Sequence, residues 1–450
     1  MSLETTPIRV LAARVAARDI GAAEVTAYFL DRIARLDGPL AGMNVVAPEM
    51  ALAAARALDA RREGAVGPLA GVPLSVKDIA DVAGLPSAGA SASRAGRIAA
   101  GDAPVVARMK AAGGIVLGKA NCHELAFGGP SFDLPFPPAR NPWDTGRFPG
   151  GSSSGSGVTV AAGLCLGSLA TDTAGSIRLP ATMCGVFGLK PTRGLLPLAG
   201  ISALAETMDH AGPIARSADD TRILFDAMAG RPPAPRGSGS LKGVRIGIPR
   251  DGWGEGAQIH PEVRGALDAA LALVEAEGGE VHVLDLPPLD HFHAPGTVVM
   301  MAEVARAHAG AVRADWNRFG AIFRARALLG EAIAPEDYAR AQRIRPLLTR
   351  RLAEGIAAVD ALLIPGAMAP PGPLADVHPF YFMKEPIPNI VANYTGLPAL
   401  AFPAGHTAEG LPLGVQILGA AGADHRLLDI AEAFELTDPA RFAARDPGLS

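Results

Sequence analysis

Cysteine and aromatic residues are scarce in this sequence, and both shortages exclude classes of protein. The 450-residue chain has three cysteines, Cys122, Cys165 and Cys184, whose odd number and spacing fit neither a disulfide framework nor a zinc site. We therefore expect three buried free thiols. Aromatic residues make up 5% of the chain, so few rings are present on which nucleic-acid bases could stack.

Runs of one charge and long apolar runs are also missing. The formal net charge is −4 and no cluster of Lys or Arg forms a basic stripe, so no nucleic-acid partner is expected, although weak or partner-supplied RNA contact is compatible with this charge. The longest weakly polar run, residues 157–170, is shorter than the about 20 residues that a membrane-spanning helix needs. No secretory signal pattern opens the sequence, and we expect a cytoplasmic protein without membrane association.

Hydrophobic residues (49%) and charged residues (19%) are present in the proportions of a folded globular protein. Apolar periodicity predicts alternating helices and strands along most of the chain. The sequence therefore favours an α/β fold with a central mixed β-sheet covered by helices on both faces. The predicted helices cover residues 7–36 (two helices), 48–63, 102–112, 157–170, 261–277, 297–356 and 424–436, and the predicted strands residues 69–77, 115–118, 244–249, 279–284, 361–365, 399–403 and 414–418.

The expected domain organisation is simple. Residues 1–65 are predicted to form N-terminal helices that pack on the core, and residues 66–450 one large α/β domain. A Pro- and Gly-rich segment at residues 231–240 is either a connector inside this domain or a boundary.

The chemistry concentrates in two segments rich in small residues, 149–157 (Pro-Gly-Gly-Ser-Ser-Ser-Gly-Ser-Gly) and 171–180 (Thr-Asp-Thr-Ala-Gly-Ser-Ile-Arg-Leu-Pro). The first segment does not fit a phosphate-binding P-loop, because no Gly-Lys-Ser/Thr follows. It matches the nucleophile-elbow pattern G-x-S-x-G formally, but a Pro-rich loop stands where that motif needs a strand. A flexible linker is the bland alternative, yet apolar segments flank the run on both sides.

Together these segments resemble the signature of the amidase signature family. Residues 71–78 (Gly-Val-Pro-Leu-Ser-Val-Lys-Asp) are similar to the lysine segment of that family. Further matches cover nearly the whole chain in order, at residues 118–127, 140–143, 188–192, 395–398 and 410–416. One departure is Ala174, where the family often has glycine.

The resemblance implies a set of site residues. Lys77 matches the catalytic lysine, Ser152 the serine that follows a cis peptide bond, and Ser176 the nucleophile, 24 positions after Ser152. The backbone amides that match the oxyanion hole of the family are those of Thr173, Ala174, Gly175 and Ser176.

Physical chemistry is consistent with these roles. A serine hydroxyl needs a base to remove its proton, and lysine is a base only when burial lowers its pKa. The apolar residues before Lys77 supply such a setting, and Ser152 between the two can relay protons in both directions. Consecutive amides at 173–176 would form an anion-binding nest for the tetrahedral intermediate.

Residues around the predicted triad are given supporting roles. Ser153 and Ser154 are expected to bond to backbone groups, and Asp172 and Arg178 to form an ion pair that holds the nucleophile loop. His210 suggests a Ser–His pair, but a structural role is favoured. Phe127, Gly128 and Gly129 match a loop that borders the substrate channel in the family.

The sequence gives no His, Asp or Glu spacing typical of a metal site, and no cofactor is expected. The predicted function is hydrolysis of a small carboxylic amide (aliphatic, aryl, hydrazide or ureide type) through an acyl-enzyme at Ser176, with a homodimer expected from the family. The alternative is the glutamine-hydrolysing A subunit of a tRNA-dependent amidotransferase. A catalytically silent protein on the same fold is the third hypothesis.

Overall fold

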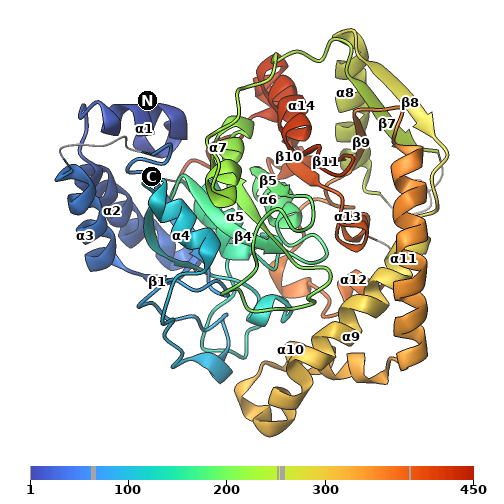
Figure 1. Cartoon of the computed structure of the whole chain (residues 1–450), viewed down its shortest axis with the longest axis horizontal. Helices are drawn as coiled ribbons and strands as arrows, with labels where there is room; N and C mark the ends of the chain where they lie inside the picture. The colour runs from blue at the N-terminus through green and yellow to red at the C-terminus, as the bar shows by residue number, and fades with distance from the viewer. Residues whose placement is uncertain (1, 62–66, 251–252, 254–258, 385–386, 450) are drawn as a thin grey trace.

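One mixed sheet organises the molecule (Figure 1). The computed structural model describes residues 2–61, 67–250, 253, 259–384 and 387–449. Within these residues the strands form one 11-stranded sheet of order β1-β3-β2-β4-β6-β5-β10-β11-β9-β7-β8. The strands are β1 (Met43–Val46), β2 (Pro73–Lys77), β3 (Ile115–Ala120), β4 (Gly167–Asp172), β5 (Phe187–Lys190), β6 (His210–Ala215), β7 (Arg245–Pro249), β8 (Glu280–Leu284), β9 (Ala361–Pro365), β10 (Ala399–His406) and β11 (Pro412–Leu418).

Two groups of strands pair in parallel, and the edge strand β1 and the middle of the sheet pair antiparallel. Strand β2 pairs in parallel with β3 and β4, and β7 pairs in parallel with β8 and β9. The central strands from β4 to β9 pair antiparallel. The predicted mixed sheet is therefore confirmed.

Helices connect the strands and cover the sheet. They are α1 (Ile8–Ala16), α2 (Ala22–Leu40), α3 (Pro48–Asp59), α4 (Pro104–Ala111), α5 (Ser154–Ala161), α6 (Arg178–Cys184), α7 (Ala218–Ala229), α8 (Pro261–Ala276), α9 (Asp290–Ala314), α10 (Ala321–Leu329), α11 (Pro335–Gly355), α12 (Tyr381–Lys384), α13 (Asn389–Thr395), α14 (Asp424–Thr437) and α15 (Pro439–Phe442).

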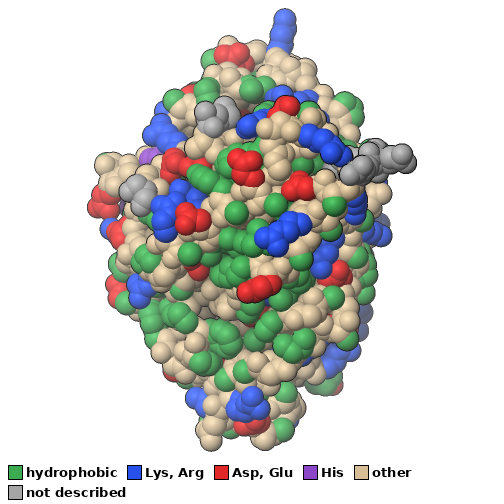
Figure 2. All heavy atoms as spheres, turned by 90° about the vertical axis from the view of Figure 1, so that its left-hand side faces the viewer, with side chains coloured by type: hydrophobic (Ala, Val, Ile, Leu, Met, Phe, Trp, Pro, Cys, Tyr) green, Lys and Arg blue, Asp and Glu red, His purple; other side chains and the backbone are tan. Residues whose placement is uncertain are grey.

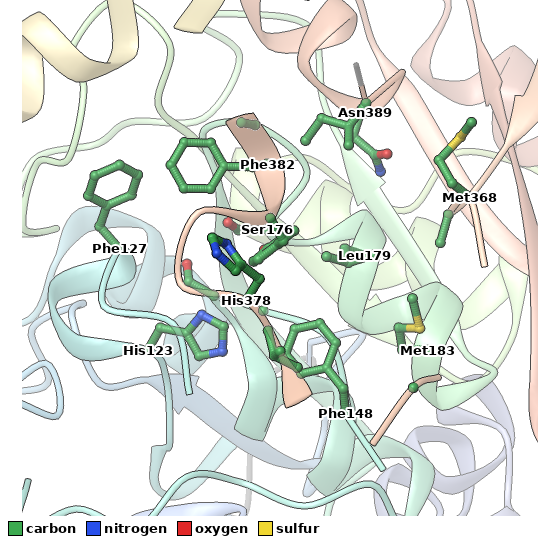
Figure 3. A pocket seen from close by; sticks show the side chains of 18 of the residues that line it. His123, Phe127, Phe148, Ser176, Leu179, Met183, Met368, His378, Phe382 and Asn389 are labelled. Atoms are coloured by element: carbon green, nitrogen blue, oxygen red, sulfur yellow. The ribbon is translucent and has the colours of Figure 1, made fainter. Parts of the chain in front are cut away.

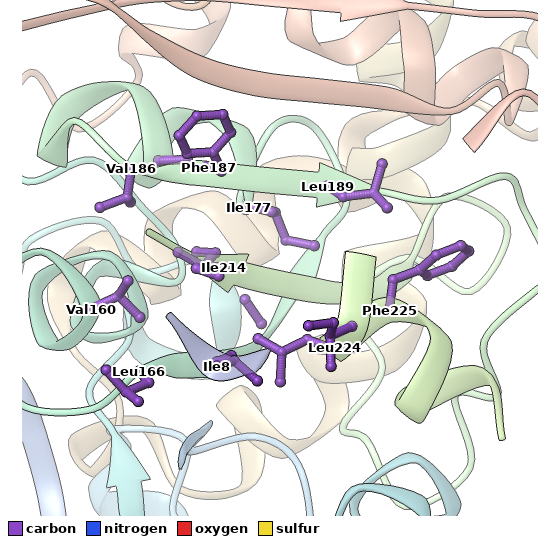
Figure 4. Packing of buried hydrophobic residues seen from close by; sticks show 14 of the residues in the cluster. Ile8, Val160, Leu166, Ile177, Val186, Phe187, Leu189, Ile214, Leu224 and Phe225 are labelled. Atoms are coloured by element: carbon purple, nitrogen blue, oxygen red, sulfur yellow. The ribbon is translucent and has the colours of Figure 1, made fainter. Parts of the chain in front are cut away.

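Both faces of the sheet are covered, as alternation along β9 shows. Ala361 and Leu363 belong to one apolar core together with residues of α8 and α14, whereas Leu362 and Ile364 belong to a second core with residues of α9, α11 and α13. Since successive side chains of a strand point to opposite faces, the two cores lie on opposite sides of the sheet. Figure 4 shows aliphatic side chains of the first core, among them Ile177, Ile214 and Leu224.

The N-terminal helices pack on this core, because Ile8, Val25 and Ala51 belong to the same cluster as the strands. The segment also contributes an element that the sequence did not reveal, strand β1, which pairs antiparallel with β3. Figure 2 shows acidic and basic side chains intermixed on this side of the molecule.

One predicted element is half wrong. Residues 157–170 were expected to be one helix, but α5 ends at Ala161 and β4 begins at Gly167. Gly163, which follows the helix, has φ +63°, a left-handed conformation that commonly ends helices. In a continuous run of small apolar residues, periodicity does not tell a buried helix from a buried strand.

The segment 231–240 is irregular and joins α7 to β7, a strand of the same sheet. It is thus a connector between two parts of one sheet. All three cysteines are free and buried, as expected. None of the helices in the described part of the chain is long and apolar enough to cross a membrane.

Candidate active site

Lys77 is the last residue of β2 and has no exposed surface. Its Nζ donates hydrogen bonds to Ser152 Oγ at 2.9 Å and to Thr171 Oγ1 at 2.7 Å. Burial lowers the pKa of Lys77 from 10.5 to about 8, against the opposing effect of nearby acidic groups such as Asp172. A substantial fraction of this lysine is therefore neutral near pH 8 and able to accept a proton.

Ser152 follows a cis peptide bond from Gly151, and the chain enters α5 two residues later. A Cβ at residue 151 would lie 2.0 Å from Cε1 of His123, so the close approach of this ring requires glycine. The Ser152 carbonyl also accepts a hydrogen bond from the His123 amide at 3.0 Å. Local sequence thus places Ser152 through small residues and one buried ring.

Ser176 lies in the turn between β4 and α6, next to Ser152 in space. The amide of Ser153 donates to the Ser176 carbonyl at 3.3 Å, which joins the two serine-containing segments. Ser176 is partly exposed to the cavity that Ser152 also lines. The turn includes Gly175 at φ +118°, where a Cβ would meet that of Asn389 at 2.7 Å.

The buried carboxylate of Asp172 holds this turn. It accepts from the amides of Gly175 at 2.6 Å and Ile177 at 3.1 Å and pairs with the Arg178 guanidinium through two bonds of 3.0 Å. Burial opposes the charge of Asp172, but Arg178 holds its pKa well below the ordinary value. The expected ion pair is present, with both side chains fully buried.

This network modifies the predicted oxyanion hole. The Gly175 amide is already engaged by Asp172 and is not free to bind an oxyanion. No hydrogen bond among the described residues uses the amides of Thr173, Ala174 or Ser176, and all three residues line the cavity. These three amides remain the candidate donors.

The other polar residues predicted near the triad have structural partners. Ser153 Oγ donates to the Thr171 carbonyl at 3.0 Å, and Ser154 is buried at the start of α5. His210 Nδ1 lies 2.7 Å from the Met208 carbonyl, and burial lowers the pKa of its ring well below 6.5. Among the described residues, no hydrogen bond joins His210 to Ser152 or Ser176.

The serines open onto a cavity of about 380 Å³ (Figure 3). Of the three predicted channel residues, Phe127 lines it, with its ring 5.5 Å from that of Phe382. Gly128 and Gly129 do not, because the chain turns away after Phe127, and Gly129 lines a smaller adjacent pocket. The apolar lining includes Phe148, Leu179, Met183, Met300, Met368, Tyr381, Phe382 and Ile387.

Several site residues could not be identified from sequence. Thr171 contacts the lysine, and Arg326 on α10 lines the cavity beneath three aromatic rings, those of Phe127, Tyr381 and Phe382. Arg326 makes no salt bridge with any described residue. No group of three or more His, Cys, Asp or Glu that could hold a metal occurs in the part of the chain that the structure describes.

A buried lysine with a lowered pKa that is hydrogen-bonded to a serine, beside backbone amides that no described residue engages, is an arrangement suited to amide hydrolysis, and comparisons with known proteins give the family. The Amidase family model matches residues 24–428, and the chain belongs to this family. The glutamyl-tRNA(Gln) amidotransferase A subunit of Symbiobacterium thermophilum is 34% identical over 461 residues, covering 93% of this chain and 94% of the relative.

Solved structures agree with this assignment. A structure described as an amidase has a TM-score of 0.87 and 31% identity, covering 96% of this chain and all of the other. A second, from a vestigial protein complex that reveals the origins of an s-triazine catabolic enzyme, has a TM-score of 0.88 and 29% identity, covering 98% of this chain and all of the other. The chain is an α/β enzyme that acts on amide C–N bonds.

Proposed function

We propose that Lys77, Ser152 and Ser176 form the triad of this enzyme and hydrolyse a monoamide of a dicarboxylic acid, with glutamine as the first candidate substrate. The observation that supports the triad best is the fully buried Lys77 amine, 2.9 Å from Ser152 Oγ at the cavity that contains Ser176.

In the acylation step, Ser176 Oγ attacks the amide carbon while its proton passes to Ser152 and the Ser152 proton passes to Lys77. The carbonyl oxygen becomes an oxyanion that the amides of Thr173, Ala174 and Ser176 stabilise. Losing one such donor typically raises the barrier by about 2.7–4 kcal/mol.

The protonated Lys77 then returns its proton through Ser152 to the leaving nitrogen. The C–N bond breaks, and ammonia or amine departs, leaving an ester on Ser176. Water attacks this ester in the second half-reaction, with Ser152 and Lys77 again accepting the proton, and the acid is released as Ser176 regains its hydrogen.

Arg326 supports the choice of acyl group. The cavity is mainly apolar, and this buried guanidinium is the cation that the structure places in its lining. Its Nε and Nη2 donate to the Pro379 carbonyl and its Nη1 to the Phe127 carbonyl, which leaves one N–H on each of Nη1 and Nη2 that can bind a carboxylate. In a linear acyl chain that ends in a carboxylate, the methylene groups can pack on the apolar wall and the carboxylate can bind Arg326.

Glutamine is favoured among such amides by the name of the curated relatives, which are A subunits of glutamyl-tRNA(Gln) amidotransferases. Its ammonium needs an acidic group, and Asp376 lines the cavity. Arg343 and Arg345 on α11 do not line the cavity. Glu385 and the side chain of Lys384 lie outside the described residues.

A second candidate is a self-sufficient amidase for an uncharged amide. The Pro- and Phe-rich segment 370–382 supports it, because Pro370, Pro373, Tyr381 and Phe382 all line the cavity. The structure with the TM-score of 0.87, described as an amidase, is similar to this chain over nearly its full length.

Ammonia release by the purified chain tests these proposals. The panel contains L-glutamine, glutaramic acid, hexanamide and benzamide, with Lys77→Ala and Ser176→Ala as controls. We expect turnover of glutaramic acid or glutamine, lost in both variants, and Arg326→Gln should raise KM for these anionic amides about tenfold or more while leaving hexanamide unchanged.

Each other outcome changes the conclusion. Turnover of hexanamide or benzamide in preference to the anionic amides would favour the second candidate. Activity that Ser176→Ala retains would contradict the triad.

A further inference from the structure

Glu124 is a buried carboxylic acid next to the cavity that the proposed chemistry does not use. It is 1% exposed and lies in η3 (Glu124–Ala126), directly before Phe127. Its carboxylate accepts hydrogen bonds from Ser91 Oγ at 2.6 Å and from the Gly320 amide at 2.9 Å. No salt bridge among the described residues includes Glu124. Burying a carboxyl group costs free energy, which its hydrogen bonds must offset.

The two residues after Glu124 have unusual backbone conformations. Leu125 has φ +44° and Ala126 has φ +66°, values that L-residues rarely adopt. Such conformations persist only when surrounding contacts hold them. Here the Leu125 amide donates to the Gly89 carbonyl at 2.8 Å, and the Phe127 and Gly128 amides both donate to the Glu124 carbonyl at 2.9 Å. The main-chain carbonyls of Gly89 and Glu124 therefore hold this strained turn, and the Glu124 side chain ties its first residue to Ser91 and Gly320.

The same carboxylate also reaches the element that carries Arg326. Gly320 is the residue before α10, and Arg326 lies in the second turn of that helix. Arg326 in turn donates to the Phe127 carbonyl, and its guanidinium carbon lies 5.3 Å from the Phe127 ring. The strained turn and α10 are thus joined at two points. The Glu124 side chain binds the start of α10, and Arg326 on α10 binds Phe127 at the end of the turn.

We propose that Glu124 is a positioning residue of the acyl cavity: it fixes the strained turn and the start of α10 against each other, and so places Phe127 and Arg326 on the same wall. The proposal rests on the proposed function, in which these two residues contact the acyl chain. Glu124 itself does not line the cavity.

Simple capping of α10 does not account for Glu124. Asp133 already accepts from the Ala321 amide at 2.8 Å, and this residue is exposed to water, where a carboxylate loses little hydration. Burial, by contrast, raises the pKa of Glu124 to about 7, against the hydrogen bonds from Ser91 and Gly320 that favour its charged form. Both carboxylates bind the start of α10, but Glu124 also connects it to Ser91 and to the strained turn. Asp133 is therefore a matched control at the same helix end.

The experiment compares Glu124→Ala, Glu124→Gln and Ser91→Ala with Asp133→Asn, using crystal structures and steady-state kinetics with glutaramic acid and hexanamide. In Glu124→Ala we expect Leu125 and Ala126 to leave their positive φ values and the Arg326–Phe127 contact to break. The KM for glutaramic acid should rise about tenfold, while kcat changes less than about threefold, because the variant weakens substrate binding and leaves the triad in place. Glu124→Gln, which keeps one acceptor, should recover part of this loss, and Ser91→Ala should show a smaller loss in the same direction.

Asp133→Asn should leave KM within about twofold of the wild-type value, since exposed capping changes affect stability more than site geometry. The proposal is overturned if Glu124→Ala keeps the turn and the Arg326–Phe127 contact, or if it lowers only the melting temperature while KM stays unchanged. If Glu124→Ala does not fold, the structures and KM values of Glu124→Gln and Ser91→Ala decide in the same way. If the wild-type chain hydrolyses no amide of the four-compound panel, the proposed function fails, and the crystal structures alone still decide whether Glu124 positions this wall.

Discussion

The pH dependence of amide hydrolysis tests the role of Lys77 directly, because the base must be neutral to act. With a pKa of about 8, about a quarter of the lysine is neutral at pH 7.5, whereas at the ordinary value of about 10.5 the neutral fraction would be about one in a thousand. We therefore expect kcat/KM to rise about tenfold per pH unit below pH 7 and to level off above pH 9.

Thr171→Val should change the pKa of Lys77 by removing one hydrogen bond. Thr171 Oγ1 accepts a hydrogen bond from Lys77 Nζ at 2.7 Å and thereby stabilises the ammonium form. Hydrogen bonds to charged groups contribute about 1.5–3 kcal/mol, or roughly one to two pKa units. Because the charged form is the one that loses its partner, the pKa must fall, and the rising limb of kcat/KM should move about one unit toward acid.

The assay is ammonia release from the best amide of the panel between pH 5.5 and 10. Ser168→Ala is the matched control, because this buried hydroxyl lies on the same strand and its hydrogen bonds go to Ser75 and Leu169. Its profile should coincide with that of the wild-type chain. A wild-type profile that is flat from pH 6 to 9 would refute the neutral-lysine argument, and a Thr171→Val limb that does not move would refute the role of this contact.

Three further predictions concern stability and local geometry. Lys77→Met should raise the free energy of unfolding at pH 7 by about 2 kcal/mol in urea denaturation; because the folded pKa is depressed, wild-type stability should also rise between pH 8 and 10.5, and the variant should lack this rise. Gly151→Ala should lower kcat by about 10²-fold or more, since the new Cβ must displace the His123 ring beside Ser152; an unchanged kcat would contradict this. Arg178→Met should destabilise the fold by about 3–5 kcal/mol, because it leaves Asp172 buried without its cation; a urea midpoint equal to that of the wild-type chain would show that the pair is dispensable.

The sequence is most informative where local backbone geometry sets the candidate site. Lys77 ends a short apolar segment, and the two serines lie in runs of small residues that allow close approach and unusual φ values. These features are encoded within a few residues of each position. The ion pair of Asp172 with Arg178 could be predicted for the same reason, since the two are six residues apart on one turn.

The acyl cavity could not be predicted in the same way, because tertiary packing assembles it from distant segments. Arg326 lies in an amphipathic helix in which arginine ordinarily marks a solvent-facing position, and only the packing of α10 on the Phe127 turn buries it. The match to a channel-bordering loop of the family predicts Phe127, Gly128 and Gly129 together, but such a match does not determine which residue of the loop faces the cavity. Asn389 on α13, which is also distant in sequence from both serines, lines the same cavity.

One wall of the cavity, α13, is hydrogen-bonded to the turn that carries Ser176, whereas the wall formed by Arg326 and Phe382 is not. Arg178 donates to the Asn389 carbonyl at 2.8 Å and to Asn393 Oδ1 at 2.6 Å while it pairs with Asp172, so α13 is bonded to the nucleophile turn. Among the described residues, no hydrogen bond joins Arg326 or Phe382 to that network. Since misplacing a reacting group affects the chemical step, Asn393→Ala, which removes the side-chain acceptor of Arg178 on α13, should lower kcat. Substitution of Phe382 by leucine should change mainly KM, measured on the same amide. If instead both variants alter only KM, then α13 is not coupled to the nucleophile turn, and the hydrogen bonds of Arg178 serve stability alone.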